Sequence, residues 1–411
     1  MRHFTMIAKS SFTRRWLPVA FVCAALVAPL TSAQQPDTPT PDVPEPQVMI
    51  PAPPQLAAKS WILIDANSGR VLAEHNSDQR LPPASLTKLM TAYLVERELD
   101  RGNIQPDDMV PISEKAWRTG GSKMFVEVGT RVSVEELLHG IVIVSGNDAS
   151  VAMSEYLAGG EDPFADLMNQ HATQLGMENT HYENAPGLPS ENHYSSARDL
   201  MRLARHIILD YPEHYAIYSQ KHFTYNGIEQ ANRNRLLWRD PSVDGLKTGW
   251  TEEAGYCLVS SGQRDDMRLI SVVMGTSSEE ARAQETQKLL SYGFRYYETL
   301  KLYDRGAVLN TPRVWEGSTN ELKVGVDNGV YMTVPRNRND ELTARLDIDS
   351  GLTAPIAAGQ RVGTMEVRLG DEVVGERDLV ALEAVEQGGL FKRMIDKVQR
   401  FFSDLVGGWF D

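Results

Sequence analysis

A serine and a lysine three residues apart begin the part of this chain where side-chain spacing points to chemistry. Ser85 and Lys88 lie in the sequence Pro83-Ala84-Ser85-Leu86-Thr87-Lys88-Leu89-Met90, at the start of an apolar helical pattern. Residues three apart on a helix are neighbours, which predicts the Lys88 amine beside the Ser85 hydroxyl. A serine attacks once a base takes its proton, and a lysine whose charge is disfavoured by burial or a second cation is such a base. The pair indicates covalent catalysis, although Ser-x-x-Lys also occurs at ordinary helix starts with an exposed lysine.

Two further motifs favour the catalytic interpretation. Ser145-Gly146-Asn147 follows the apolar helical run 134–144, and Lys247-Thr248-Gly249 begins a segment typical of a strand. Ser-x-x-Lys, Ser-Asp-Asn and Lys-Thr-Gly together are the signature of penicillin-binding proteins and class A β-lactamases. Here the three elements occur in that order, with Gly146 in the middle of the second. From about residue 50 to the C-terminus the chain resembles the low-molecular-mass penicillin-binding proteins, which are serine-type D-alanyl-D-alanine carboxypeptidases.

The resemblance implies a catalytic role for four side chains. Ser85 is expected to form the acyl-ester and Lys88 to accept its proton. Ser145 is expected to relay a proton toward the leaving amine, and Asn147 to hold the substrate amide. The expected substrate is a peptidoglycan stem peptide ending in D-Ala-D-Ala, and β-lactam antibiotics are expected to inhibit by acylating Ser85. Removal of the terminal D-Ala limits cross-linking.

The resemblance also implies a substrate-binding set. Its members are expected to bind the terminal carboxylate, to line the site, or to supply an oxyanion-hole N–H together with the backbone of Ser85, and they are Lys247, Thr248, Gly249, Trp250, Arg233 and Arg282. Lys247 is also expected to lower the pKa of Lys88 as a second cation. Trp250 is a departure, because many relatives have histidine after Lys-Thr-Gly. Arg233 and Arg282 match arginines near the site in the family, and surface arginines are the alternative.

Two other functions remain as alternatives. A class A-type β-lactamase needs a glutamate that activates water for fast deacylation, and Glu183-Asn184 and Glu191-Asn192 have the wrong spacing for it. A non-catalytic peptidoglycan-binding scaffold with the same fold is disfavoured by the intact motifs.

Composition and motif content limit the classes of partner and cofactor that the chain is expected to bind. The 411 residues carry a formal charge of −14, which argues against nucleic acid, since phosphate contacts need clustered Lys and Arg. No His-Glu-x-x-His pair, cysteine cluster, phosphate-binding glycine loop or dinucleotide fingerprint occurs, so neither metal nor cofactor is predicted.

The N-terminal segments indicate export. Residues 1–33 combine Arg14-Arg15, an apolar run and small residues before a cleavage point, which predicts a signal peptide. A retained membrane anchor and a twin-arginine signal are the alternatives. Residues 34–56 are rich in proline and predict an extended linker. The expected location is the periplasmic side of the bacterial inner membrane.

The rest of the chain predicts an α+β domain, an all-β domain and one final helix. Residues 57–300 fit one antiparallel sheet with helices on its faces, ending in a helix over 281–300. The resemblance implies the serine-β-lactamase/DD-peptidase-like fold for this domain. In residues 301–388 valines alternate with polar residues between turns, which predicts a small β-sandwich.

Residues 389–411 predict an amphipathic helix. Apolar residues recur at spacings of three and four with basic residues between them, and these are Phe391, Met394, Ile395, Val398, Phe401, Phe402, Leu405 and Val406, with Lys392, Arg393, Lys397 and Arg400. This pattern favours a helix that lies in a membrane interface and peripherally anchors the enzyme. The alternative is an ordinary helix that docks on the β domain.

Overall fold

The computed structural model describes residues 50–407, with side chains through residue 400. The predicted signal peptide, residues 34–49 of the predicted linker and residues 408–411 lie outside the described residues. The side chains of Phe401, Phe402, Leu405 and Val406 lie outside them as well.

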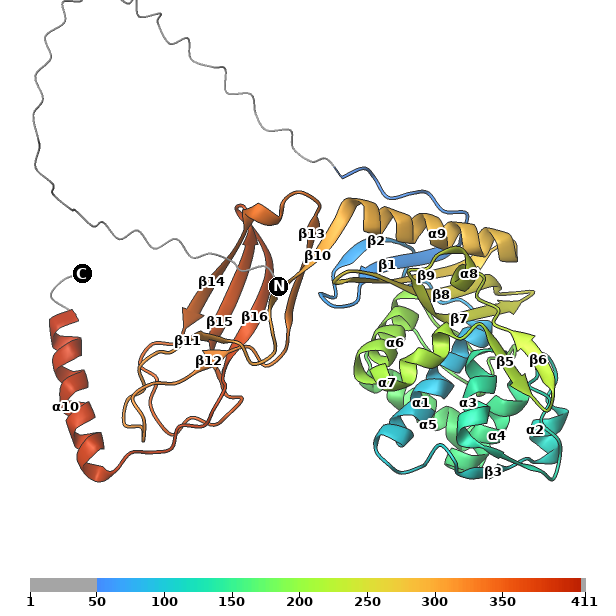
Figure 1. Ribbon diagram of the computed structural model, residues 1–411, viewed down its shortest axis with the longest axis horizontal. Helices are drawn as coiled ribbons and strands as arrows, with labels where there is room; N and C mark the ends of the chain where they lie inside the picture. Colours follow the sequence, from blue (N-terminus) through green and yellow to red (C-terminus); the bar gives the residue numbers. More distant parts are fainter. Residues whose placement is uncertain (1–49, 408–411) are drawn as a thin grey trace, which may run out of the picture. The chain divides into compact units, whose positions relative to one another are not determined.

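A five-stranded antiparallel sheet forms the centre of the first domain. Its strand order is β2-β1-β9-β8-β7. The strands are β1 (Ser60–Asp65), β2 (Val71–His75), β7 (Val243–Thr251), β8 (Gly255–Arg264) and β9 (Met267–Thr276). β1, β8 and β9 are almost wholly buried because apolar side chains point to both faces, and each face is covered by helices. Helix α9 (Glu279–Tyr296) and the short helix α8 (Leu236–Arg239) pack on one face, and most of the other helices gather on the opposite face (Figure 1).

The helical side of the sheet carries most of the first domain. Its elements are η1 (Ala84–Thr87), α1 (Lys88–Asp100), α2 (Glu114–Arg118), α3 (Val134–Val142), α4 (Asn147–Ala158), α5 (Glu161–Gln174), α6 (Ala197–Asp210), α7 (Pro212–Tyr215) and η2 (Ala216–Ser219). Two small two-stranded sheets accompany them, made of β3 (Met109–Pro111) with β4 (Arg131–Ser133), and β5 (His222–Tyr225) with β6 (Ile228–Ala231). Leu86, Leu89 and Met90 are fully buried in the core that these helices share with the sheet.

The α+β fold predicted for this domain is confirmed, with two local corrections. The helix expected to start at the Ser85 motif begins three residues later, at Lys88, because a 3₁₀ turn, η1, precedes α1 and contains Ser85. The predicted helix over 281–300 is wrong in its last residues. α9 ends at Tyr296, and the chain continues as strand β10 (Tyr297–Tyr303), which pairs with β13 (Val330–Pro335).

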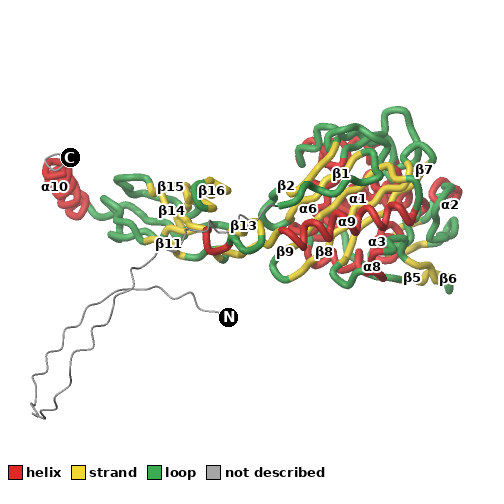
Figure 2. The backbone as a smooth tube through the Cα atoms, turned by 90° about the horizontal axis from the view of Figure 1, so that it is seen from above, coloured by secondary structure: helices red, strands yellow, loops and turns green. Residues whose placement is uncertain are grey.

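The second part of the chain is all-β, as predicted. Besides β10 and β13 it contains β11 (Val308–Asn310), β12 (Val324–Gly325), β14 (Leu342–Ile348), β15 (Arg361–Leu369), β16 (Glu372–Ala381) and the short η3 (Asn339–Glu341). Five strands form a sheet of order β11-β12-β16-β15-β14. Buried side chains from this sheet and from β13 form one core, including Met332, Met365 and Val367. Figure 2 shows strands and loops throughout this part, followed by the helix α10 (Leu390–Gly407).

Helix α10 contacts the β domain through its polar face. The carboxylate of Asp396 is buried and accepts the backbone N–H of Glu316 at 2.8 Å. The opposite face is exposed to solvent. Leu390 is 80% exposed and Phe391 is 82% exposed. No helix among residues 50–407 is long and apolar enough to cross a membrane.

Glu96 is a buried acid in the helix that follows Ser85. Its side chain is inaccessible to solvent, and Oε1 accepts a hydrogen bond from the Tyr218 hydroxyl at 2.8 Å. Oε2 has no partner among the described residues. Burial raises the pKa of Glu96 to about 8, so the folded chain holds this proton at neutral pH.

We expect the substitution Glu96→Gln to change how stability depends on pH. Between the ordinary pKa of 4.5 and the folded pKa of about 8, the folded state binds a proton that the unfolded state has released. Stability from this group therefore falls as pH rises through that range. Glutamine does not titrate. The free energy of unfolding of the variant, measured relative to that of the parent, should therefore rise by about 3 kcal/mol from pH 5 to pH 8. Urea unfolding of both proteins at the two pH values measures it, and parallel pH profiles would contradict it.

Candidate active site

Ser85 lies in the tight turn that leads into α1. Ala84, just before it, has a positive φ of 49°, an uncommon conformation for a residue with a side chain. The turn leaves Ser85 partly exposed while Lys88 is fully buried. The Lys88 amine donates to Ser85 Oγ at 3.0 Å, so the structure places these two side chains in contact as the spacing predicts.

The Lys88 amine has two further partners, and both are acceptors. It donates to Asn147 Oδ1 at 2.7 Å and to the Pro186 carbonyl at 2.7 Å. A carbonyl oxygen can only accept, so a neutral amine uses its two hydrogens on these two oxygens. Its lone pair is then directed at the third partner, the hydroxyl of Ser85. The geometry suits a base that removes the serine proton.

The electrostatics of the pocket favour the neutral amine. Burial is the main cause that lowers the pKa of Lys88 to about 7, the nearby Arg233 guanidinium lowers it further, and the Asp148 carboxylate opposes them. A large fraction of the amine is therefore unprotonated at neutral pH. Lys247 lies in the same cluster, where the charges of Lys88 and Arg233 lower its own pKa. Its expected effect on the pKa of Lys88 stays a prediction.

The Ser145-Gly146-Asn147 motif lies between α3 and α4. Ser145 has a positive φ of 62°, and its side chain is buried. Asn147 begins α4, and its amide nitrogen donates to the Gly120 carbonyl at 2.7 Å while Oδ1 accepts from Lys88. One amide side chain thus connects the base to the loop that contains Gly120.

Asp148 holds that loop in place. Its fully buried carboxylate accepts the backbone N–H groups of Met124, Phe125 and Val126 at 2.9, 2.9 and 3.2 Å. A carboxylate that accepts several N–H groups orders the backbone that supplies them. The loop on one side of the site is therefore fixed by the residue next to Asn147.

Lys247 on strand β7 is the second buried lysine. Its amine donates to Ser145 Oγ at 2.9 Å and to the Thr248 carbonyl at 3.1 Å. Burial, together with the neighbouring charges of Lys88, Arg233 and Arg282, holds the pKa of Lys247 well below its ordinary value. A carboxylate bound beside it would favour the charged form, because opposite charges stabilise each other in a buried site.

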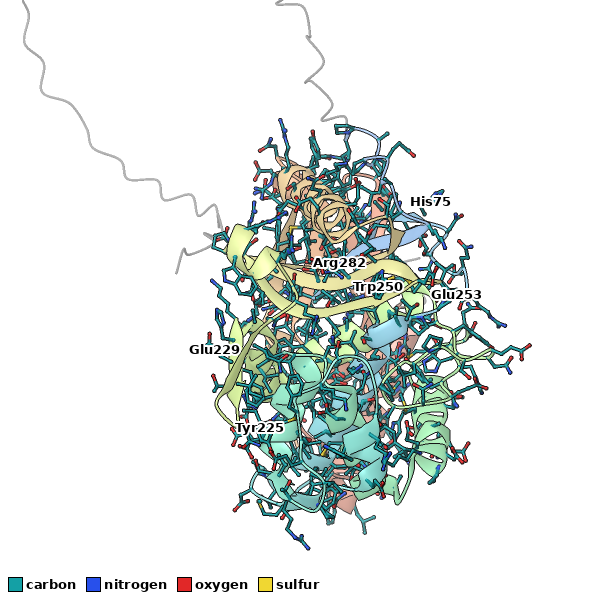
Figure 3. All side chains as sticks on the ribbon, turned by 90° about the vertical axis from the view of Figure 1, so that its right-hand side faces the viewer. His75, Tyr225, Glu229, Trp250, Glu253 and Arg282 are labelled. Atoms are coloured by element: carbon teal, nitrogen blue, oxygen red, sulfur yellow. The ribbon has the colours of Figure 1, made fainter. Side chains whose placement is uncertain are left out.

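A pocket of about 200 Å³ opens over these groups. It is lined by Ser85, Ser122, Ser145, Arg233, Thr248, Gly249, Trp250, Tyr256, Glu279 and Arg282. Trp250 and Arg282 lie next to each other in Figure 3. The Trp250 side chain is 55% exposed, whereas Arg282 is buried over the ring of Tyr256. The structure thus gathers every residue of the predicted site into one region, with Lys88, Asn147 and Lys247 beneath the pocket.

Sequence reasoning missed several members of this region. Pro186 contributes a backbone carbonyl, which any residue type can supply, so no sequence signal was present. Asp148 follows the second motif directly, and an acid at the start of an otherwise apolar helix was a usable signal. Tyr256 and Glu279 come from segments with no catalytic pattern. Among residues 50–407 no group of three or more His, Cys, Asp or Glu side chains is arranged to hold a metal ion.

Comparison with known proteins agrees with this geometry. Residues 47–278 match the family model of D-alanyl-D-alanine carboxypeptidases, peptidase family S11, and residues 297–387 match the C-terminal domain of penicillin-binding protein 5. The carboxypeptidase DacA of Escherichia coli is 43% identical over 369 residues, 88% of this chain and 92% of the relative. DacC of the same organism is 44% identical over 365 residues, 87% and 91% of the two chains.

A solved structure extends the comparison to the fold. The crystal structure of penicillin-binding protein 5 from Haemophilus influenzae is similar with a TM-score of 0.76 and 43% identity, covering 82% of this chain and 99% of that one. The similarity therefore includes the catalytic motifs, the sheet that positions them and the C-terminal β domain. The chain belongs to the S11 family of D-alanyl-D-alanine carboxypeptidases, in the group of penicillin-binding protein 5.

Proposed function

We propose that this protein removes the terminal D-Ala from peptidoglycan stem peptides through an acyl-enzyme on Ser85. The observation that carries the proposal is the buried Lys88 amine, whose two hydrogens are held by carbonyl oxygens while Ser85 Oγ lies 3.0 Å away. Family membership supplies the substrate class, since its relatives are named D-alanyl-D-alanine carboxypeptidases.

Acylation follows from the positions of the two lysines. Ser85 Oγ attacks the carbonyl carbon of the penultimate D-Ala while Lys88 accepts the hydroxyl proton. The backbone N–H groups of Ser85 and Trp250 stabilise the oxyanion, and one such donor is worth about 10²–10³ in rate. Ser145 gives a proton to the leaving amine, with Lys247 as the donor beside its hydroxyl. The terminal D-Ala then departs.

The pocket beyond Ser85 suits the free carboxylate of the substrate. Lys247, Thr248, Arg233 and the buried Arg282 surround it with positive charge and a hydroxyl. A β-lactam has a carboxylate in a comparable position relative to its reactive carbonyl, so the same groups would bind penicillin. Support for penicillin as a ligand comes from the Haemophilus influenzae relative, which is itself named a penicillin-binding protein.

The two alternative functions are less well supported. A β-lactamase needs a carboxylate that activates water beside the acyl-ester. The segment that reaches Lys88 presents the Pro186 carbonyl there, and the Glu183 side chain of the same segment bonds instead to Ser190 and to the Asn192 N–H. A non-catalytic scaffold would not require a buried, hydrogen-bonded lysine beside the serine, because such burial of an amine is costly.

We also propose that the final helix anchors the enzyme on the periplasmic side of the inner membrane. The exposed face of α10 is formed by Leu390, Phe391, Met394, Ile395 and Val398. An exposed apolar stripe of this kind favours insertion into a lipid interface. Its polar side contacts the β domain instead, so the apolar stripe remains available to a membrane.

The contacts of α10 change what is expected of its basic residues. Arg393 and Lys397 pair with Glu316 at 3.4 and 3.9 Å, Lys392 donates to the Gly317 carbonyl, and Arg400 donates to Thr353 Oγ1 at 3.1 Å. Charges already paired within the protein attract anionic lipid less than free ones. Insertion of apolar side chains, about 1.5–3 kcal/mol for each one fully buried, should dominate membrane binding.

Labelling with a reporter-tagged penicillin tests the proposed nucleophile. The parent protein should form a stable adduct that mass spectrometry locates on the peptide containing Ser85, and Ser85→Ala should form none. An exposed serine replaced by alanine, such as Ser350, serves as the matched control and should label normally. Rapid turnover of the drug would instead identify a β-lactamase, and absence of any adduct in the parent would indicate a scaffold.

Arginine substitutions should separate the roles of the two lysines. Lys88→Arg keeps a cation but cannot lose its proton in the working range, so it should nearly abolish acylation. Lys247→Arg keeps a donor for the carboxylate and should retain measurable acylation. In the parent, the acylation rate should rise with pH through about 7, where Lys88 loses its proton. Equal losses in the two variants, or a pH-independent rate, would refute this division of roles.

Sedimentation with anionic vesicles tests the membrane anchor. A chain of residues 34–388 should acylate normally with penicillin yet remain in the supernatant, whereas residues 34–411 should sediment. Binding of the longer chain should weaken in part when salt is raised, because Arg393 and Lys397 share the carboxylate of Glu316 whereas Lys392 and Arg400 bond only to neutral oxygens and keep their charge. Replacement of Phe391 and Ile395 by serine should release it. Equal sedimentation of both chain lengths would assign the anchor to another segment.

A further inference from the structure

The segment Glu183–His193 closes one side of the site and touches the nucleophile turn directly. It supplies the Pro186 carbonyl to Lys88 and the Ala185 carbonyl to Thr91, each at 2.7 Å. Gly187 has a φ of +79°, and a Cβ there would lie 2.0 Å from the Ala84 carbonyl oxygen. The segment is therefore in close backbone contact with η1, and a small displacement of it would move the Pro186 oxygen away from the amine.

His193, the last residue of that segment, is buried and connects it to η1. Its Nδ1 accepts the backbone N–H of Glu183 at 3.1 Å, and its Nε2 lies 2.8 Å from Thr87 Oγ1. A backbone N–H can only donate, so Nδ1 must be unprotonated and Nε2 must carry the hydrogen. The imidazole is thus neutral, with one tautomer, and Nε2–H donates to Thr87.

Burial keeps the ring in this neutral state. It lowers the pKa of His193 to about 4, the cationic Lys88 and the imidazole of His181 lower it further, and the Glu183 carboxylate opposes them. Across the range in which Lys88 titrates, His193 therefore does not change its charge. Its contribution there is geometric.

We propose that His193 is a positioning residue for the general base, acting through Thr87 and the Pro186 carbonyl. Thr87 lies between Ser85 and Lys88, and the imidazole joins it to the two ends of the segment that supplies the carbonyl. This bridge fixes the distance between the Pro186 oxygen and the Lys88 amine. The carbonyl in turn holds one amine hydrogen, so that the lone pair is aimed at the Ser85 hydroxyl. The inference rests on the proposed role of Lys88 as the base.

Two substitutions of His193 each keep one of its two hydrogen bonds and remove the other. His193→Gln places an amide N–H near the position of Nε2 and keeps the bond to Thr87. His193→Asn places a carbonyl oxygen near the position of Nδ1 and keeps the bond to Glu183 but cannot reach Thr87. The glutamine and asparagine side chains are both polar and no larger than histidine, so the two variants form a matched pair. Thr87→Val removes the same link from the other side with little change in shape.

The measurement is the second-order rate constant for acylation by labelled penicillin from pH 5 to pH 10, with thermal melting of each variant as a check on folding. The Gln variant should stay within about threefold of the parent. The Asn and Val variants should lose about 10- to 100-fold, the effect of misplacing a group in the site. Their pH midpoint should rise, because water beside Lys88 relieves the burial that lowers its pKa, while Asp148, Arg233 and Lys247 stay in place.

A double variant, His193→Asn with Thr87→Val, should acylate no more slowly than either single variant, because both substitutions remove the same hydrogen bond between His193 and Thr87. Equal rates for the Gln and Asn variants, or losses with an unchanged pH midpoint in folded protein, would overturn the proposal. Failure of Lys88 as the base would appear separately, as normal acylation by Lys88→Arg.

Discussion

A lysine can take a proton from serine only while its own amine is neutral, and this single requirement shapes the site. In water a lysine amine is charged at neutral pH. Full burial of Lys88 removes the hydration that favours the ammonium, and the Arg233 guanidinium adds to that effect. The buried amine must still have its hydrogens satisfied, so the fold has to bring acceptors to it from distant parts of the chain.

Those acceptors explain why the domain has this architecture. Asn147 comes from the start of α4 and Pro186 from the segment before α6. Ser85, whose hydroxyl faces the lone pair of the neutral amine, comes from the turn before α1. The central sheet supplies the opposite wall through Lys247 on β7. Asp148 and His193 hold no proton for the reaction in this arrangement, yet each fixes a loop whose position decides whether the amine is correctly oriented.

Much of this arrangement was predictable from the sequence, for identifiable reasons. Ser85, Lys88, Ser145, Asn147 and Lys247 belong to short motifs in which the residue type itself is required by the chemistry. Backbone contributions such as the Pro186 carbonyl leave no such trace. Boundaries were also less predictable. The helical pattern of α9 runs into Tyr297, where pairing with β13 turns the chain into a strand, and that partner lies more than 30 residues further on.

Helix α10 shows why an amphipathic pattern alone does not tell which face is buried. The sequence is compatible with an apolar face packed on the β domain or with one inserted in lipid. The contacts separate the two, because Asp396 is the buried side chain and Phe391 is exposed. The charged face makes hydrogen bonds and ion pairs with the β domain, whereas the apolar face has no such contacts among the described side chains. An exposed apolar face of this kind supports the proposal that α10 binds at a membrane interface.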